Sequence, residues 1–410
     1  MHPEEQSTTA LVAVEGEKLP VKAEKTESYW ARIASRYTVI WRVLLIVLIL
    51  FTVLFMLLFS RAFTYDSIFC FFKDLQTVSA FVPPDYGTVS ATFEEGEHTA
   101  LSYRGGVAFV NSGGVEVYSP DGHRLLNVDR VFSTPRAVAS RKYLLAYDSG
   151  GTTFSVTNSY TELFHGETEF PILGATVSDS GHFALITTSD EVLSQVLLYD
   201  NNFNLIQRFR RASATVGVSL SDNGKRIALI GATAESGTPQ SVLEIFRLGE
   251  AAPELSLGFQ NEFPLSVAFT GNKYFAIFTN RALRCCHLDG DIKAEVALNG
   301  NPVGLDVNSN GILLALETDE ISAAHRILAL DAKGNTLYDG SHEGDITALK
   351  MGERELFWLS GDRAVRLDTD TKKVTERSIE QGATDMFCVG DGQLRLVYPA
   401  KVEYLVFEEE

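Results

Sequence analysis

From about residue 87 onwards, hydrophobic and polar residues alternate in short runs that Gly, Asn, Asp and Ser interrupt at close intervals. Alternation with a period of two is the pattern of a β-strand, and the interrupting residues are those that favour turns. Residues 172–210 show one full cycle: ILGATVS, the turn DSG, HFALITT, a longer loop, QVLLYD, the turn NNF, and NLIQRF. This cycle predicts four consecutive antiparallel strands, a β-meander.

The same cycle recurs about every 41 residues, a period typical of four-stranded propeller blades. Its copies start near His98, Pro135, Ile172, Thr215, Pro264, Pro302, Asp345 and Ala383. We therefore predict an all-β fold, an eight-bladed β-propeller of four-stranded antiparallel blades, with seven blades as the nearest alternative count. A pair of β-sandwiches is the alternative architecture, because sandwiches also use short strands.

The last cycle contains only three strands, TDMFCVG, QLRLVYPA and KVEYLVFE. The segment GTVSATFEE, from Gly87, precedes the first complete cycle and has no blade of its own. Pairing the two would complete the eighth blade and remove an exposed sheet edge. We predict a propeller over residues 87–410 whose ring is closed by this N-terminal strand.

Residues 39–59, VIWRVLLIVLILFTVLFMLLF, are strongly apolar, and Arg42 is their only charged residue. As a helix they would span roughly 30 Å, the thickness of a bilayer's hydrocarbon core. Basic residues are more frequent before this stretch than shortly after it, which predicts a cytoplasmic N-terminus. We expect a disordered cytoplasmic tail (1–37), a transmembrane helix that contacts lipid (38–60), a juxtamembrane amphipathic segment (61–86) and an extracytoplasmic propeller. A cleaved signal peptide is the alternative, but the apolar stretch is long and a tail precedes it.

The formal charge is −18 at pH 7, and residues 1–60 carry equal numbers of acidic and basic side chains. All of the acidic excess therefore lies after residue 60. Such a body repels phosphate backbones, so we expect no nucleic acid partner.

Several blade segments, YSPDG, SDSGHFALI and LDTDTKKV, resemble those of bacterial β-propellers of the YVTN, WD40-like and quinoprotein-like groups. The order of tail, single span, amphipathic stretch and propeller also resembles an uncharacterised family of bacterial single-pass membrane proteins with a domain of unknown function. The resemblance implies the fold but no activity. The Gly-His and Trp-Asp signature of WD40 blades is absent, and Trp358 is the only tryptophan after residue 60. The docking motif of quinoprotein enzymes is therefore absent too, and we expect no pyrroloquinoline cofactor.

In a four-stranded meander the first and third turns lie at one end of the blade, which we call the tight-turn face. The second turn and the crossing to the next blade lie at the other end, the irregular face, where the longer segments TTSDEVLS, GATAESGTPQ, ETDEISAAHR and GSHEGD fall. Irregular loops on a rigid scaffold are where binding sites usually occur. We therefore place a candidate binding site on the irregular face, with Asp190, Glu191, Glu235, Asp319, Glu320, His325, His342, Glu343 and Asp345 as its candidate residues.

Motifs of catalysis are missing: the chain has no HExxH, GxSxG or GxxxxGK[ST]. His325 and His342, near four carboxylates, are the best acid–base candidates, with solvated loop residues as the alternative interpretation. The Asp/Asn-Gly turns lack the spacing of a calcium loop, so we expect no metal and no cofactor. Cys285 and Cys286 are neighbours in a strand and should point to opposite faces as buried thiols.

These observations favour a non-enzymatic function: a membrane-anchored extracytoplasmic propeller that binds a protein, peptide or cell-envelope component. One alternative is an envelope hydrolase or lyase that uses carboxylates and a histidine near the propeller channel. Another is a structural subunit of an envelope complex.

Overall fold

The structure is a computed structural model that describes residues 36–37, 39–51, 89–92, 98–235, 237–319 and 324–407. Residues 36–37 and 39–51 are helical, and no helix within the described ranges is both long and apolar enough to cross a bilayer. Most of the predicted tail, residues 38 and 52–60 of the predicted span and all of segment 61–86 lie outside these ranges. The chain divides into two units, Met1–Phe69 and Cys70–Glu410.

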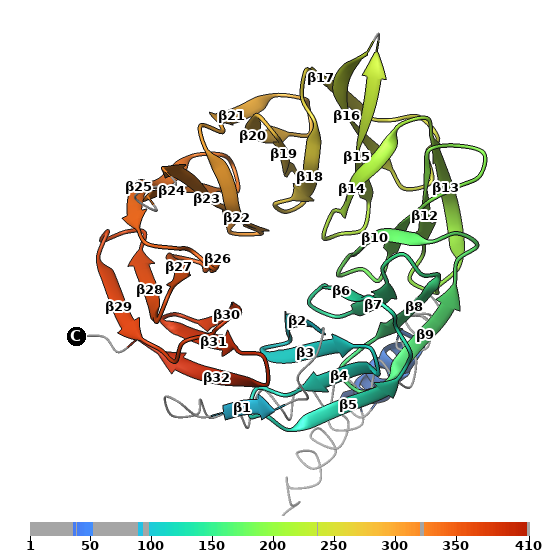
Figure 1. The fold of residues 1–410 in the computed structure, drawn as a ribbon. Helices are drawn as coiled ribbons and strands as arrows, with labels where there is room; N and C mark the ends of the chain where they lie inside the picture. Colours follow the sequence, from blue (N-terminus) through green and yellow to red (C-terminus); the bar gives the residue numbers. More distant parts are fainter. Residues whose placement is uncertain are drawn as a thin grey trace, which may run out of the picture. The chain divides into compact units, whose positions relative to one another are not determined.

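The described part of the second unit contains eight four-stranded antiparallel sheets that surround a central opening (Figure 1). In seven of the sheets the strands follow one another in sequence order, which confirms the predicted meander. We number these blades 1 to 8 by their first strand. Blades 1 to 4 consist of β2 (His98–Tyr103), β3 (Gly106–Asn111), β4 (Gly114–Tyr118) and β5 (Arg124–Asp129); β6 (Pro135–Ala139), β7 (Leu144–Asp148), β8 (Thr153–Thr157) and β9 (Glu162–Glu167); β10 (Ile172–Val177), β11 (Phe183–Thr187), β12 (Ser194–Tyr199) and β13 (Leu205–Arg211); and β14 (Ala214–Leu220), β15 (Arg226–Glu235), β16 (Thr238–Arg247) and β17 (Leu255–Gln260).

The second half of the ring continues the pattern. Blades 5 to 8 consist of β18 (Pro264–Phe269), β19 (Tyr274–Thr279), β20 (Ala282–His287) and β21 (Ile292–Ala297); β22 (Asn301–Asn308), β23 (Gly311–Asp319), β24 (Ala324–Asp331) and β25 (Thr336–Glu343); β26 (Ala348–Met351), β27 (Glu355–Ser360), β28 (Arg363–Asp368) and β29 (Val374–Ser378); and β30 (Asp385–Gly390), β31 (Gln393–Val397), β32 (Lys401–Val406) and β1 (Val89–Thr92). The first strands start within three residues of the predicted positions; the largest difference is in blade 7, which begins at Ala348.

The ring is closed by its two ends. β1 pairs antiparallel with β32, with Thr92 opposite Lys401, and becomes the outer strand of blade 8. Each first strand contacts the first strand of the next blade, and β30 contacts β2, so the cycle is complete. The predicted eight blades and the predicted closure by the N-terminal strand are both confirmed.

The hydrophobic core lies between neighbouring blades rather than within one layer. Separate clusters fill successive gaps, such as Phe183 and Tyr199 between blades 2 and 3, and Phe275 and Ile277 between blades 4 and 5. Middle strands such as β11 and β12 are buried along their whole length because a blade covers each of their faces. Burial on both faces explains why these strands are almost continuously apolar.

The tight-turn face is built as the sequence predicts. Asp179-Ser180-Gly181 and Asp222-Asn223-Gly224 form turns in which Gly181 and Gly224 adopt φ of 88° and 61°. A side chain at Gly224 would also collide with Ser180 of the neighbouring turn, 1.9 Å from its Oγ. Glycine therefore serves both the turn conformation and the close approach of adjacent blades.

Candidate functional site

The predicted site residues lie on the irregular face but do not form one cluster. Asp190 and Glu191 lie in the β11–β12 loop of blade 3, where Glu191 pairs with Arg210 at 2.8 Å. Glu235 ends β15 in blade 4, and Asp319 ends β23 in blade 6. Glu320 lies outside the described residues. Only the candidate residues of blade 6 and of its crossing to blade 7 lie near one another. They are Asp319, His325, His342, Glu343 and Asp345.

The expected irregular segments are largely strand. β15 and β16 extend as a hairpin whose pairing runs to Glu235 opposite Thr238, so the predicted loop from Gly231 does not exist. His325 lies in β24 and His342 in β25, directly opposite each other. The sequence did not reveal that these segments are strands, because their polar composition is typical of loops. Backbone pairing nevertheless continues the strands through them.

The two histidines are packed rather than solvated. His325 is 3% exposed. His342 contacts the Trp358 ring edge-to-face, with 5.5 Å between the centroids, and its Nε2 lies 3.0 Å from the Ser360 Oγ. Burial lowers the pKa of His342. The interpretation as solvated loop residues is therefore wrong, and as members of third and fourth strands the histidines do not line the central opening.

Two cavities lie at the opposite end of the central opening, near the tight turns. Their volumes are about 600 and 800 Å³, and both include Asn308 and Ser309 of the β22–β23 turn in their lining. The smaller cavity also holds Asp306, Lys350 and Asp385, from three successive first strands. This polar site escaped sequence reasoning, because the three residues are far apart in the chain and belong to no motif.

Asp306 lines the smaller cavity and is held by several polar contacts. Burial raises its pKa, while the nearby Lys350 ammonium, 3.8 Å away, acts in the opposite direction. Its Oδ2 accepts hydrogen bonds from the Met351 N–H at 2.9 Å and from the Asn308 amide at 3.1 Å. Lys350 lies equally far from Asp385, at 3.8 Å. A carboxyl group in these surroundings can exchange a proton closer to neutral pH than an exposed one.

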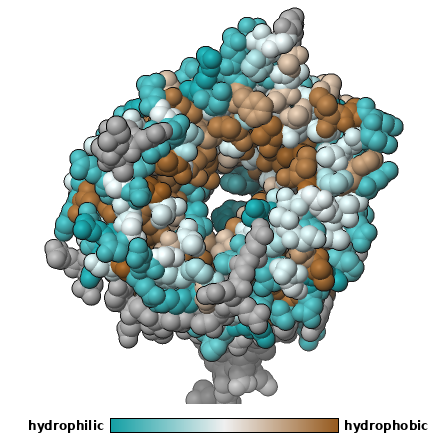
Figure 2. Space-filling model, viewed as in Figure 1, coloured by the Kyte–Doolittle hydropathy of each residue, from teal (hydrophilic) through white to brown (hydrophobic). Residues whose placement is uncertain are grey.

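The irregular-face end of the opening is apolar over half its circumference. In each of blades 3 to 6 a register shift near the start of the first strand leaves one aliphatic residue unpaired, a β-bulge. These four residues, which we call the apolar collar, are Leu173, Val216, Leu265 and Val303, with exposed fractions of 51%, 38%, 38% and 39%. Figure 2 shows hydrophobic residues gathered around the upper part of the opening, over β14, β18 and β22.

A small residue follows every collar residue: Gly174, Gly217, Ser266 and Gly304. The need for a small residue at this position is clearest at Gly304, where a Cβ would lie 2.4 Å from the Leu349 Cδ2 of the next blade. The recurring aliphatic–small pair is the sequence signal that could have located the collar. The first strands of blades 1, 2 and 7 show no such register shift, and exposed polar residues such as Arg136 and Thr347 occupy that half of the rim.

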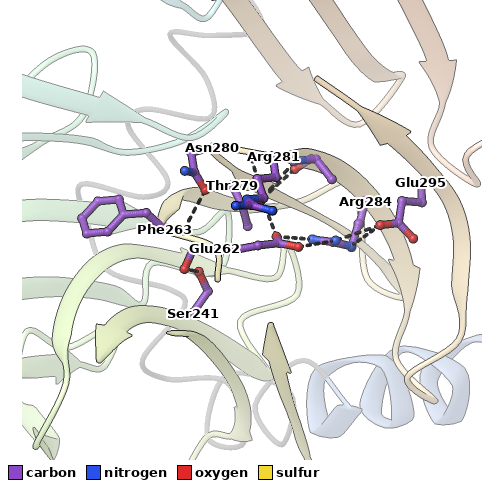
Figure 3. A network of polar contacts seen from close by, with 9 residues as sticks. Ser241, Glu262, Phe263, Thr279, Asn280, Arg281, Arg284 and Glu295 are labelled. Carbon is purple, nitrogen blue, oxygen red and sulfur yellow. Dashed lines mark hydrogen bonds and ion pairs between the residues drawn. The ribbon is translucent and has the colours of Figure 1, made fainter. Parts of the chain in front are cut away.

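A buried ion-pair network positions the crossing that leads into β18 (Figure 3). Glu262 of this crossing accepts two hydrogen bonds from Arg284 of β20 and one from the Thr279 hydroxyl at 2.7 Å. The backbone is held as well, since the Glu262 carbonyl accepts from Ser241 and the Phe263 N–H donates to Asn280, both at 2.8 Å. Phe263, 47% exposed, is thereby presented next to the collar residue Leu265.

The thiols are placed as predicted. Cys285 and Cys286 are fully buried and pack into different inter-blade clusters, so their side chains do point to opposite faces. Burial raises the pKa of Cys285 to about 11 and that of Cys286 to about 12. Within the described residues, no group of His, Cys, Asp and Glu side chains is arranged to hold a metal ion.

The fold and the rim define the class of protein: a closed eight-bladed β-propeller with charged side chains at one end of its central opening and a half-apolar rim at the other. The model of a family of unknown function, DUF5711, matches residues 86–406, and the chain belongs to this family. A comparison with curated proteins gave no match.

Solved structures share the fold at low sequence identity. BamB from Moraxella catarrhalis is 11% identical, with 77% of this chain and 99% of that chain covered and a TM-score of 0.50. Sqt1 from Chaetomium thermophilum, solved bound to the N-terminus of the ribosomal protein L10, is 12% identical, with 79% and 100% covered and a TM-score of 0.50. A eukaryotic initiation factor structure is 13% identical, with 81% and 89% covered and a TM-score of 0.53.

Proposed function

We propose that the protein is a non-enzymatic scaffold that binds a protein partner on the irregular face of its propeller. The observation that carries this proposal is the apolar collar, because four aliphatic side chains exposed around one rim are costly in water and stabilising in a complex. The ring that holds them is closed and packed between all its blades, so the surface is preorganised. Sqt1, a ring of similar fold, binds a protein terminus, which supports this function class.

We further propose that the scaffold is tethered to a membrane through residues 38–60, with the propeller outside the cytoplasm. Helical residues 39–51 expose large apolar side chains on all sides, among them Trp41 at 68%, Leu44 at 65% and Leu50 at 64%. Basic residues precede this segment, as expected for a cytoplasmic N-terminus. Protease treatment of intact cells should remove the propeller; full protection in cells, with cleavage after lysis, would contradict the orientation.

Site-specific photo-crosslinking in native membranes tests the scaffold function. A photoreactive amino acid at Val303 should form a defined adduct with one protein. The matched control is Val374, which is 49% exposed on the outer strand β29 and should give no such adduct. Identical patterns from the two positions, or none from either, would argue against a partner on the irregular face.

A second candidate function, a hydrolase or lyase, is favoured by one observation: Asp306, with its raised pKa, faces a cavity of about 600 Å³ beside Lys350. Such a carboxyl group can act as a general acid or base. An activity found in a substrate screen should fall by about 10²-fold or more in Asp306→Asn, and remain in Asp370→Asn, an exposed turn residue. Equal activity in both variants would remove this candidate.

A further inference from the structure

We propose that the apolar collar and the carboxylates of Glu343 and Asp345 together form the docking site for a basic amphipathic segment of the partner. The segment would carry aliphatic side chains on one side and Lys or Arg on the other. This inference rests on the proposed scaffold function and names the chemistry of its partner.

The collar is a repeated structural device and not a chance exposure. An extra residue in a strand interrupts the ladder of hydrogen bonds, and here it occurs at the same place in four consecutive blades. Each bulged aliphatic residue is 38% to 51% exposed and is therefore not packed in the inter-blade core. The following small residue lets the neighbouring blade pack closely: a Cβ at Gly217 would lie 3.2 Å from the backbone N of Val267 in blade 5.

The collar covers only half of the rim, and exposed polar residues lie on the other half. Apolar side chains come from blades 3 to 6, while exposed Arg136, Thr347 and Thr384 belong to blades 2, 7 and 8. A segment lying across this end of the opening would therefore contact aliphatic side chains on one side and polar groups on the other. An amphipathic segment has that division.

Charge complementarity indicates that the polar side of the segment is basic. Glu343 ends β25 of blade 6, the blade that contributes Val303, and Asp345 lies in the crossing from blade 6 to blade 7. Both are exposed, and neither makes an ion pair within the described parts of the chain. The body as a whole carries the entire charge excess of −18, so an acidic partner would be repelled.

The described ends of the two closing strands, β1 and β32, point away from the collar. Lys401 follows the second turn of blade 8 and so lies at the irregular face, and β1 pairs with β32 so that Thr92 is opposite Lys401. Val89 and Val406 therefore both lie toward the tight-turn face. The four collar residues themselves keep exposed fractions of 38% to 51%.

The test uses the full chain in nanodiscs of zwitterionic lipid, with empty nanodiscs as background. The probe is a fluorescent helical peptide of Leu and Lys, about 14 residues long, and its counterpart replaces every Lys by Glu. Fluorescence anisotropy should show saturable binding of the Leu/Lys peptide above background. The Leu/Glu peptide should bind at least about tenfold more weakly.

Two pairs of variants locate the site. Val216→Thr with Val303→Thr keeps side-chain shape and should raise the Kd about tenfold, whereas Ile292→Thr with Val374→Thr, on outer strands, should leave it unchanged. Glu343→Gln with Asp345→Asn should weaken binding about threefold and reduce its salt dependence. Thermal unfolding of each variant shows that the ring is intact.

Binding no stronger than to empty nanodiscs, an unchanged Kd in the collar variant, or equal binding of the Leu/Glu peptide would each overturn the inference. The outcome is separable from that of the scaffold function. If Val303 crosslinks a partner in membranes and the collar variant still retains it, the scaffold stands and this docking site falls. If the peptide binds as expected while no membrane partner is crosslinked, the site exists and the scaffold function falls.

Discussion

Arg284 and Glu262 are joined by two charge-assisted hydrogen bonds, from Nη1 to Oε2 at 2.6 Å and from Nη2 to Oε1 at 2.7 Å. Arg284 lies on the third strand of blade 5, and Glu262 lies in the crossing from blade 4. The pair therefore ties the crossing beside the collar to the body of the next blade. Arg284 also lies over the Phe259 ring, 4.4 Å from its centroid, and bonds Glu295 at 2.8 Å.

Removing the arginine should be strongly destabilising. In Arg284→Met the buried Glu262 keeps its charge but loses its cation, which typically costs about 3–5 kcal/mol of unfolding free energy. Urea denaturation measures this loss. The matched control, Arg363→Met, breaks an exposed pair with Glu376 and should cost less than about 1 kcal/mol. Similar losses of unfolding free energy in the two variants would show that the Arg284–Glu262 pair is no more important for stability than an exposed pair.

The same pair predicts a pH dependence. The Arg284 hydrogen bonds hold the pKa of Glu262 below its ordinary 4.5, although burial acts in the opposite direction. A carboxyl group with a lowered folded pKa adds stability that is present above its unfolded pKa and is lost as the pH falls through the folded value. The stability difference between the protein and Glu262→Gln should therefore be largest above pH 4.5 and shrink below it. Denaturation series between pH 7 and pH 3 measure this difference; a gap that stays constant would contradict the prediction.

Ring closure depends on a buried arginine at the seam between the last and first blades. Arg395 of β31, 1% exposed, donates to the Pro120 carbonyl at 2.8 Å and to the Gly105 carbonyl. Burial lowers its pKa to about 10, so it stays charged at neutral pH. In Arg395→Met the Gly105 and Pro120 carbonyls of blade 1 lose this hydrogen-bond donor. The free energy of unfolding should fall by about 2–4 kcal/mol.

Hydrogen exchange distinguishes this effect from general destabilisation. In Arg395→Met, protection should fall first in β1, β2 and β32, which flank the seam. Blades 4 and 5 should be affected least under native conditions. An even loss of protection around the ring would refute a specific role at the closure.

A methyl group on the glycine after the last collar bulge should destabilise the fold. In Gly304→Ala the added Cβ would lie 2.4 Å from the Leu349 Cδ2, and overpacking of this kind costs about 1–3 kcal/mol. Gly174→Ala is the matched control, since its Cβ would lie 3.3 Å from the Ile186 Cδ1 and should cost less. Thermal unfolding compares the two. Adding Leu349→Val to Gly304→Ala should restore part of the loss, and a failure to do so would place the strain elsewhere.

Sequence reasoning succeeded where a feature depends on local, repeated patterns. The first strands of blades 2 and 5 begin at Pro135 and Pro264, as the alternation and the turn residues predict. The unpaired segment near Gly87 and the three-stranded last cycle together predicted the closure between β1 and β32. Each of these predictions needs only the count of strands and their period.

The candidate site was predicted less well, because it depends on register and on neighbours distant in the chain. Leu265 resembles any inner-strand residue until pairing with β19 shows that it is bulged out. Asp306 and Lys350 have no motif, and they meet only because β22 and β26 are adjacent first strands. His325 resembles a loop residue, yet β24 continues through it and buries it.

The amino-acid sequence by itself determined the repeating blade, the number of blades and the strand that closes them, since alternation and turn chemistry act within a few residues. Only the tertiary structure revealed the apolar collar, the charged cavity and the buried histidines. Those features arise where separate blades pack against one another, and the exposure of a side chain there depends on the partner strand and not on its own neighbours in the chain.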